Sequence, residues 1–215
     1  MLKNDNIEGV KASLLYAIKN ELTETYPSEF GDYISSKGNK CVKVYWADTV
    51  RYQPRYPYCT LTPHKDISEG LDEVYYIKKA DGLLIKRTVT RSFMPVTIEI
   101  SDMGNENLGK SSLKADTFAH KVSRQLRKYF NGDDMLDWFS GNEYYDKQIS
   151  VVVETDVDPS VEWSDTDTEF KYSFDIKLGW DEYSDVVVDK ANGAIINVYE
   201  DTNKIDEFTM KFSEN

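Results

Sequence analysis

The sequence has few of the residues on which metal sites, disulfide frameworks and hydrolytic triads depend. Its 215 residues include two cysteines, Cys41 and Cys59, and two histidines, His64 and His120. These four residues do not have a zinc-binding spacing. The cysteines are expected to be buried or half-buried free thiols in a reducing cytoplasm. Each histidine is expected to lie at the surface or to have its hydrogen bonds satisfied, because no serine or cysteine nucleophile pattern surrounds it.

Long apolar runs, basic blocks and glycine-rich loops are also missing. No segment approaches the ~20 apolar residues that cross a membrane, and the first residues lack the apolar core of a signal peptide. The eleven glycines are scattered through turns, so they form no phosphate-binding loop. With 38 acidic and 26 basic residues the net charge is -12, which opposes binding to the outside of nucleic acid. We therefore expect a soluble protein that is not exported by a signal peptide.

The most regular pattern lies in residues 169–180. Every second position carries an apolar or aromatic residue, and only an extended strand places all of these on one face. They are Phe170, Tyr172, Phe174, Ile176, Leu178 and Trp180. The opposite face would carry Lys171, Ser173, Asp175, Lys177 and Gly179. The pattern predicts an antiparallel sheet with one dry face and one face turned to water or to a partner.

Two helices are expected to pack on this sheet. The first runs over about residues 7–26, because apolar residues recur there at helical spacing after possible caps at residues 4–6. The second lies within residues 112–130, where an apolar stripe runs beside four basic residues and Asn131-Gly132 ends the helix. The basic residues are Lys121, Arg124, Arg127 and Lys128. A short further helix is expected over residues 135–139.

The remaining patterns predict strands. They cover residues 42–46, 59–61, 74–77, 149–153, 186–188, 195–199 and 208–212, with turns at Asp81-Gly82 and Asn192-Gly193. Residues 83–101 are expected to be mostly strand, interrupted near Pro95, and to bend or to lie at a sheet edge. The sequence thus predicts an α+β fold, a mainly antiparallel sheet with two packed helices and a C-terminal β-hairpin region. One domain, residues 1–215, is expected, with residues 183–215 as a candidate C-terminal β extension.

One pattern resembles the machinery of an enzyme. Metal-dependent nucleases place an Asp and an acidic-x-Lys triplet on neighbouring strands, which hold a divalent ion beside a water-activating lysine. Asp158, Glu169 and Lys171 follow this order. However, Glu169 and Lys171 lie on the polar face of an alternating strand, where such residues are expected in any case. The nuclease is therefore the alternative hypothesis, and we expect a protein that is not an enzyme.

Two further clusters have competing interpretations. An acidic group could bind calcium, but it lacks the glycine that the twelve-residue calcium loop needs at its sixth position, which favours a solvated loop over residues 156–167. The group comprises Asp156, Asp158, Glu162, Asp165, Asp167 and Glu169. An aromatic loop, residues 51–58, combines arginines and tyrosines as interface hot spots do. Its candidate partner-binding residues are Arg51, Tyr52, Arg55, Tyr56 and Tyr58. A proline-stiffened loop whose tyrosines cap the sheet edge is the equally open alternative.

The order of the elements, together with several short motifs, resembles one known family. The chain runs from a helix through a strand with Trp46 and a proline-tyrosine loop to a long strand, a helix, a valine-rich strand and the aromatic strand. The motifs are Tyr56-Pro57-Tyr58-Cys59-Thr60-Leu61, Arg87-Thr88-Val89-Thr90-Arg91, the helical Ala115, Phe118, Ala119 and Leu126, and Phe174-Asp175-Ile176-Lys177-Leu178-Gly179-Trp180. In these features the chain resembles the tail-terminator, or neck-terminator (tail-completion), proteins of tailed bacteriophages.

This resemblance implies a structural virion protein with no catalytic residues, cofactor or metal. Such proteins form rings, usually of six copies, that cap the tail tube and join it to the head. The implied partners are further copies of the chain, the tail tube protein and a head-completion or connector protein. Genomic DNA would pass through the ring without specific binding, since an acidic channel repels phosphate. The expected location is the neck or tail of the virion, after assembly in the host cytoplasm and without membrane contact.

A ring subunit also needs sheet edges that are open to its neighbours. The long strand expected over residues 83–101 would supply such an edge, together with the two-faced strands.

Overall fold

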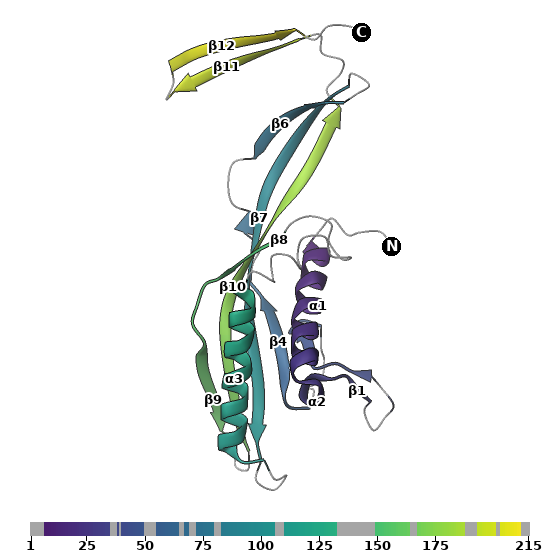
Figure 1. Ribbon diagram of the computed structural model, residues 1–215, viewed down its shortest axis with the longest axis vertical. Coiled ribbons are helices and arrows are strands. Elements are labelled where there is room, and N and C mark those ends of the chain that lie inside the picture. The colour runs from purple at the N-terminus through teal and green to yellow at the C-terminus, as the bar shows by residue number, and fades with distance from the viewer. Residues whose placement is uncertain are drawn as a thin grey trace. The chain divides into compact units, whose positions relative to one another are not determined.

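The computed structural model describes most of the chain, in two compact units (Figure 1). The first unit comprises residues 1–69 and 91–181, and the second comprises residues 70–90 and 182–215. The described residues are 7–34, 38, 40–49, 55–64, 67–68, 72–79, 83–105, 110–132, 149–163, 167–187, 193–200 and 203–211. Of the expected features, the caps at residues 4–6, the helix over residues 135–139 and the turns at 81–82 and 192–193 involve residues outside this set.

Two helices open the chain, and a third lies between two runs of strands. In order they are α1 (Ile7–Thr25), α2 (Pro27–Phe30), β1 (Tyr33–Ile34), β2 (Lys40–Cys41), β3 (Val44–Trp46), β4 (Tyr58–Pro63), β5 (Ile67–Ser68), β6 (Glu73–Lys78), β7 (Leu84–Gly104), α3 (Ser112–Phe130), β8 (Ile149–Val153), β9 (Asp158–Trp163), β10 (Thr168–Val187), β11 (Gly193–Glu200) and β12 (Asn203–Lys211). The α+β class, the two long helices and the mainly antiparallel sheet are as predicted.

The main sheet has the strand order β3-β4-β7-β10-β8, and β9 pairs with β10 beyond the β8 pairing. The pairings of β4, β5 and β6 with β7 and of β8 and β9 with β10 are antiparallel, whereas that of β3 with β4 is parallel. In the first unit, α1 and α3 lie on the same face of this sheet (Figure 1). Their apolar sides and one face of the sheet form a single core. Residues that represent the core are Leu14, Ile18, Val122, Leu126, Ile98 and Phe174.

The alternating strand behaves as its sequence predicts. Phe174, Ile176 and Leu178 are buried in the core, whereas the alternate residues Asp175 and Lys177 are only half-buried on the opposite face. We call this opposite face of the sheet in the first unit the open face. It bears Thr97, Glu99, Glu169, Lys171 and Asp175. None of the described helices covers it.

The expected interruption of the long strand is wrong. β7 runs through Pro95 without a break and lies inside the sheet, between β4 and β10, so it is no edge strand. The Pro95 carbonyl accepts a hydrogen bond from the His64 amide at 2.9 Å, just beyond the end of β4. Because the N–H and C=O of one residue in an antiparallel strand point to the same neighbour, the donor that proline lacks faces the end of β4. The pairing with β10 is unaffected.

The expected acidic loop over residues 156–167 is also partly wrong. Residues 158–163 form β9, which pairs with β10 from Trp163 opposite Thr168 to Asp158 opposite Ser173. The acidic residues and Pro159 indicate a loop, but a strand at a sheet edge tolerates both, because one of its sides has no ladder to maintain. β10 likewise continues past Trp180 to Val187, where a separate strand was expected.

The second unit contains β6, the first part of β7, the last part of β10, and the β11–β12 hairpin. β6 pairs with β7 from Glu73 opposite Val89 to Lys78 opposite Leu84. Arg87 donates two hydrogen bonds of 2.8 Å to the carboxylate of Asp185, which ties β7 to β10. The hairpin expected at the C-terminal end is present as β11 paired with β12.

Phe174 tests the face assignment of β10. Phe174→Ala is expected to lower the free energy of unfolding by about 3–5 kcal/mol, because the ring is 1% exposed and its removal leaves a cavity. Ser173→Ala, on the opposite face, is the matched control and is expected to cost little. Urea unfolding of the two variants measures the difference, and equal midpoints would contradict the assignment.

Candidate functional site

The described part of the aromatic loop is held against the sheet. Tyr58 is 6% exposed, and its hydroxyl donates a hydrogen bond of 2.9 Å to Glu169 on β10. The ring centroids of Tyr56 and Tyr58 lie 5.0 Å apart, and those of Tyr58 and Tyr45, on β3, lie 5.9 Å apart. Burial raises the pKa of Tyr56 and of Tyr45, so both phenols stay protonated at neutral pH. These tyrosines therefore form part of the fold.

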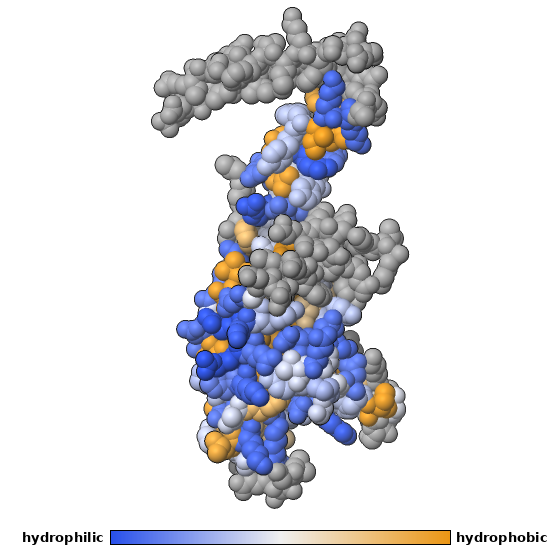
Figure 2. Space-filling view, in the orientation of Figure 1, coloured by the Kyte–Doolittle hydropathy of each residue, from blue (hydrophilic) through white to orange (hydrophobic). Residues whose placement is uncertain are grey.

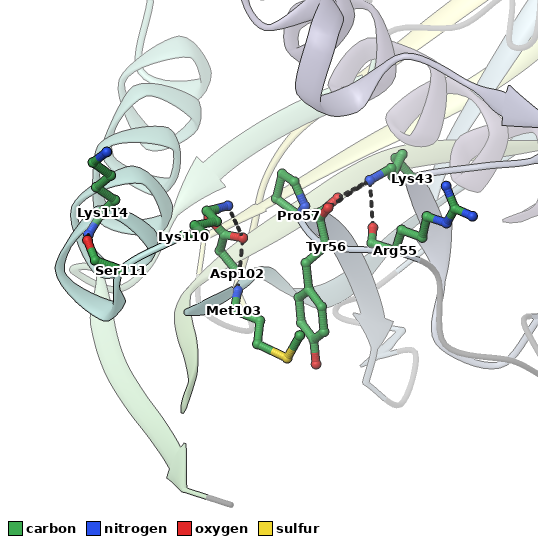
Figure 3. A network of polar contacts seen from close by, with 9 residues as sticks. All are labelled: Lys43, Arg55, Tyr56, Pro57, Asp102, Met103, Lys110, Ser111 and Lys114. Carbon is green, nitrogen blue, oxygen red and sulfur yellow. Dashed lines mark hydrogen bonds and ion pairs between the residues drawn. The ribbon is translucent and has the colours of Figure 1, made fainter. Parts of the chain in front are cut away.

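Lys43 anchors the start of β4 (Figure 3). Its ammonium group donates hydrogen bonds to the carbonyls of Arg55, Tyr56 and Pro57 at 2.6, 3.2 and 3.0 Å. Burial lowers the pKa of Lys43 to about 8, and the three carbonyls are the acceptors that a buried ammonium group needs. Lys43 was not singled out from the sequence, because nothing in residues 42–46 shows that this side chain turns inward beneath a loop.

Of the five candidate interface residues, the structure describes three. Tyr58 is buried, Tyr56 is half-buried and Arg55 is exposed, while Arg51 and Tyr52 lie outside the described residues. The Arg55 guanidinium lies over the Tyr33 ring, 5.2 Å from its centroid. The backbone N–H of Arg55 donates a hydrogen bond of 3.1 Å to the Tyr33 hydroxyl. Tyr56 and Tyr58 thus cap the sheet, and a partner-binding role of the loop stays a prediction.

A cluster of carboxylates surrounds one lysine on the open face. The Lys171 ammonium group lies 2.6 Å from Glu162 on β9 and 3.6 Å from Glu169 on its own strand. Burial raises the pKa of Glu99 on β7; the charge of Lys171 opposes this, and Glu169 and Glu162 add to it. Asp158 shares this face, since it pairs across from Ser173 on the polar side of β10. The carboxylates therefore outnumber the cation.

Lys171 of the nuclease triplet is held as an ammonium group among carboxylates. Burial lowers the pKa of Lys171, but Glu162, Glu169 and Glu99 outweigh this effect and raise it overall. These contacts favour the protonated form, whereas a general base needs the neutral amine. Among the described residues, no group of three or more His, Cys, Asp and Glu side chains is placed to hold a metal ion. Asp165 of the acidic group lies outside the described residues.

The histidines and cysteines match their expectations. His64 shares a hydrogen bond of 2.8 Å with the Thr97 hydroxyl, which in turn donates to Asp175 at 2.6 Å. His120 is exposed on α3 and stacks on the Tyr172 ring at 5.0 Å. Cys41 and Cys59 are buried free thiols. None of the described helices is long and apolar enough to cross a membrane.

The outer side of α3 carries a basic surface to which the sequence analysis assigned no role. Its exposed cations recur at helical spacing and line up on the side away from the core. We call Lys114, Lys121, Arg124 and Lys128 the basic face. A shallow groove of about 1060 Å³ runs along the C-terminal half of α3 and includes three of them. Figure 2 shows the hydrophilic side chains that gather over α3.

Large apolar side chains are exposed at two strand edges. On β9, which pairs only with β10 among the described strands, Trp163 is 79% exposed and Val161 is 40% exposed. In the second unit, β6 exposes Val74, Tyr75, Tyr76 and Ile77. Exposed aromatic residues on a sheet edge are typical of surfaces that bind another chain.

No known protein family matches the sequence, and no curated protein matches it. The resemblance to tail terminators therefore rests on the element order and the motifs of the sequence.

Magnesium-dependent cleavage tests the alternative hypothesis. The purified protein is expected to leave supercoiled plasmid intact with magnesium or manganese, because Lys171 is protonated and held between carboxylates. Agarose gels record the outcome. Cleavage that disappears in Lys171→Ala would establish the nuclease instead.

Glu99→Gln is expected to raise the free energy of unfolding at pH 7, because it removes the cost of burying a carboxylate. The folded-state pKa of Glu99 lies above its usual value of 4.5, so this cost is present at high pH and disappears as the pH falls below that value. Urea unfolding at pH 7 and pH 4 measures the gain. The exposed Glu162→Gln is the control, and a Glu99→Gln gain of equal size at both pH values would contradict the cause.

Proposed function

We propose that the chain is a structural protein of the bacteriophage neck, a ring-forming tail terminator that caps the tail tube and joins it to the head. The partners in this proposal are further copies of the chain, six in the ring, the tail tube protein and a head-completion or connector protein. Genomic DNA passes through the ring without specific binding. The protein acts in the neck or tail of the virion after assembly in the host cytoplasm.

The observation that carries the proposal is the one-sided packing of the first unit. Both of its long helices lie on one face of the sheet, and no described helix covers the open face or the β9 edge. An isolated enzyme domain gains nothing from an exposed Trp163 on a strand edge. In a ring subunit, such surfaces are buried by the neighbouring copies.

The charge of the chain fits the same role. A net charge of -12 per copy gives a ring a strongly negative potential, which repels the phosphates of DNA in the channel. DNA in such a channel can slide, because no set of cation–phosphate contacts has to be broken. The acidity also keeps free subunits apart until salt or a tube end favours their association.

Assembly is expected to depend on ionic strength and on the tube. At low salt the protein is expected to be a monomer or a weak oligomer, because charges of -12 repel over long distances. Screening shortens this reach to about 8 Å at physiological salt, so a closed ring is expected at higher ionic strength or on tube ends. Light scattering against salt concentration, followed by negative-stain images with the tube protein, measures both effects.

Two results of these measurements would contradict the proposal. A compact twofold dimer at every salt concentration, without binding to tube ends, would contradict both the ring geometry and the terminator function. A monomer that neither assembles at any ionic strength nor binds tube ends would contradict them as well.

A further inference from the structure

We propose that the basic face of α3 in one copy binds the open face of the sheet in the next copy, beside β9. This contact rests on the proposed ring function and identifies the two surfaces that join its subunits.

The basic face provides the cations. Lys114, Arg124 and Lys128 are exposed, and the structure records no ion pair between them and any described carboxylate. Lys121 contacts the Tyr26 ring at 5.7 Å with its ammonium group. Arg127 differs, because it binds Asp156 at 2.8 Å and the Thr155 carbonyl at 3.0 Å. The basic face is thus positive on a chain whose net charge is negative.

The open face provides the carboxylates. Glu99, Glu162 and Glu169 are near the single ammonium group of Lys171, and Asp158 lies four residues before Glu162 on the same face of β9. Glu162 is 62% exposed and is accessible to an incoming cation. A guanidinium or ammonium group from a neighbour would balance the negative charge of this cluster. Its ion pairs with the carboxylates would be stronger in the less polar environment of an interface.

The positions of the two surfaces favour a ring over a dimer. The basic face lies on the outer side of the helix layer, and the open face lies on the opposite side of the sheet layer of the same unit. A contact between opposite sides of a subunit is heterologous: each copy uses its basic face toward one neighbour and its open face toward the other. When the rotation between copies closes, such contacts form a ring.

A second copy is favoured over DNA as the occupant of the basic face. The net charge of -12 repels a duplex at long range, whereas the open face of another copy offers carboxylates at the contact itself. Screening by salt weakens the long-range repulsion more than it weakens partly buried pairs. The contact is therefore compatible with assembly that increases at moderate ionic strength.

The test uses two charge-reversed variants of the full chain at one ionic strength, at which the wild type forms rings. The first variant, Arg124→Glu/Lys128→Glu, makes the basic face negative. The second, Asp158→Lys/Glu162→Lys, makes the β9 side of the open face positive. Each variant alone brings like charges together at every contact, so its half-assembly concentration is expected to rise about 100-fold.

Mixing the two variants is expected to restore assembly. In an alternating ring every reversed basic face meets a reversed open face, and every original basic face meets an original open face. Native mass spectrometry should then show rings with equal numbers of the two variants. This rescue also demonstrates that both variants are folded, and thermal unfolding measured by circular dichroism checks each one separately.

The matched control changes the net charge without touching either surface. Lys204→Glu/Lys211→Glu, in β12 of the second unit, adds as much negative charge as the first variant and is expected to assemble nearly as well as the wild type. If this control loses assembly to the same extent, net charge is the cause and the proposed contact is wrong. Variants that assemble as the wild type does, or a mixture that stays monomeric, would also overturn it.

Two further outcomes separate this inference from the proposed function. Rings that form and bind tube ends regardless of the charge reversals would leave the terminator function standing and reject this contact. A wild type that forms no ring and binds no tube end would reject both. If wild-type protein binds duplex DNA in gel shifts and Arg124→Glu/Lys128→Glu abolishes this binding without affecting the rings, the basic face is a nucleic-acid surface instead.

Discussion

The packing of β10 under two helices is the interaction on which the rest of the first unit depends. Phe174, Ile176 and Leu178 meet the apolar sides of α1 and α3 in one core, and this burial sets the register of the whole sheet. A slip by one residue would bring Asp175 and Lys177 into the core. The helices therefore lie on one face only, and the polar residues of β10 are committed to the other face.

This register also places the charged residues of the open face. Lys171 and Glu169 alternate with the core residues of β10, Glu99 alternates with those of β7, and β9 adds Glu162. Their charges do not cancel within the subunit. Such a surface costs stability in the isolated chain, and cations from a neighbouring copy, as proposed above, would offset that cost.

Local patterns predicted the two long helices and the face of β10, because a period of 3.6 or 2 depends only on neighbouring residues. The bounds of α3 and β8 agree with the sequence predictions, and α1 ends within one residue of its predicted end. Two of the wrong predictions share a reason. The sequence shows that Pro95 lacks a donor and that residues 158–163 include Asp158, Pro159 and Glu162. Which strand lies beside these residues depends on distant parts of the chain, and that neighbour decides whether a strand forms.

By itself, the sequence determined the class of fold, the apolar face of β10, the net charge and the basic side of α3. Only the tertiary structure decided that Tyr58 bonds to Glu169, 111 positions away, that Lys43 turns inward to three carbonyls, and that the basic and acidic surfaces lie on opposite sides of one unit. The physical reason is that periodicity records which side of an element is apolar. The element that covers that side, and therefore the surface that remains exposed, is selected by packing between distant parts of the chain.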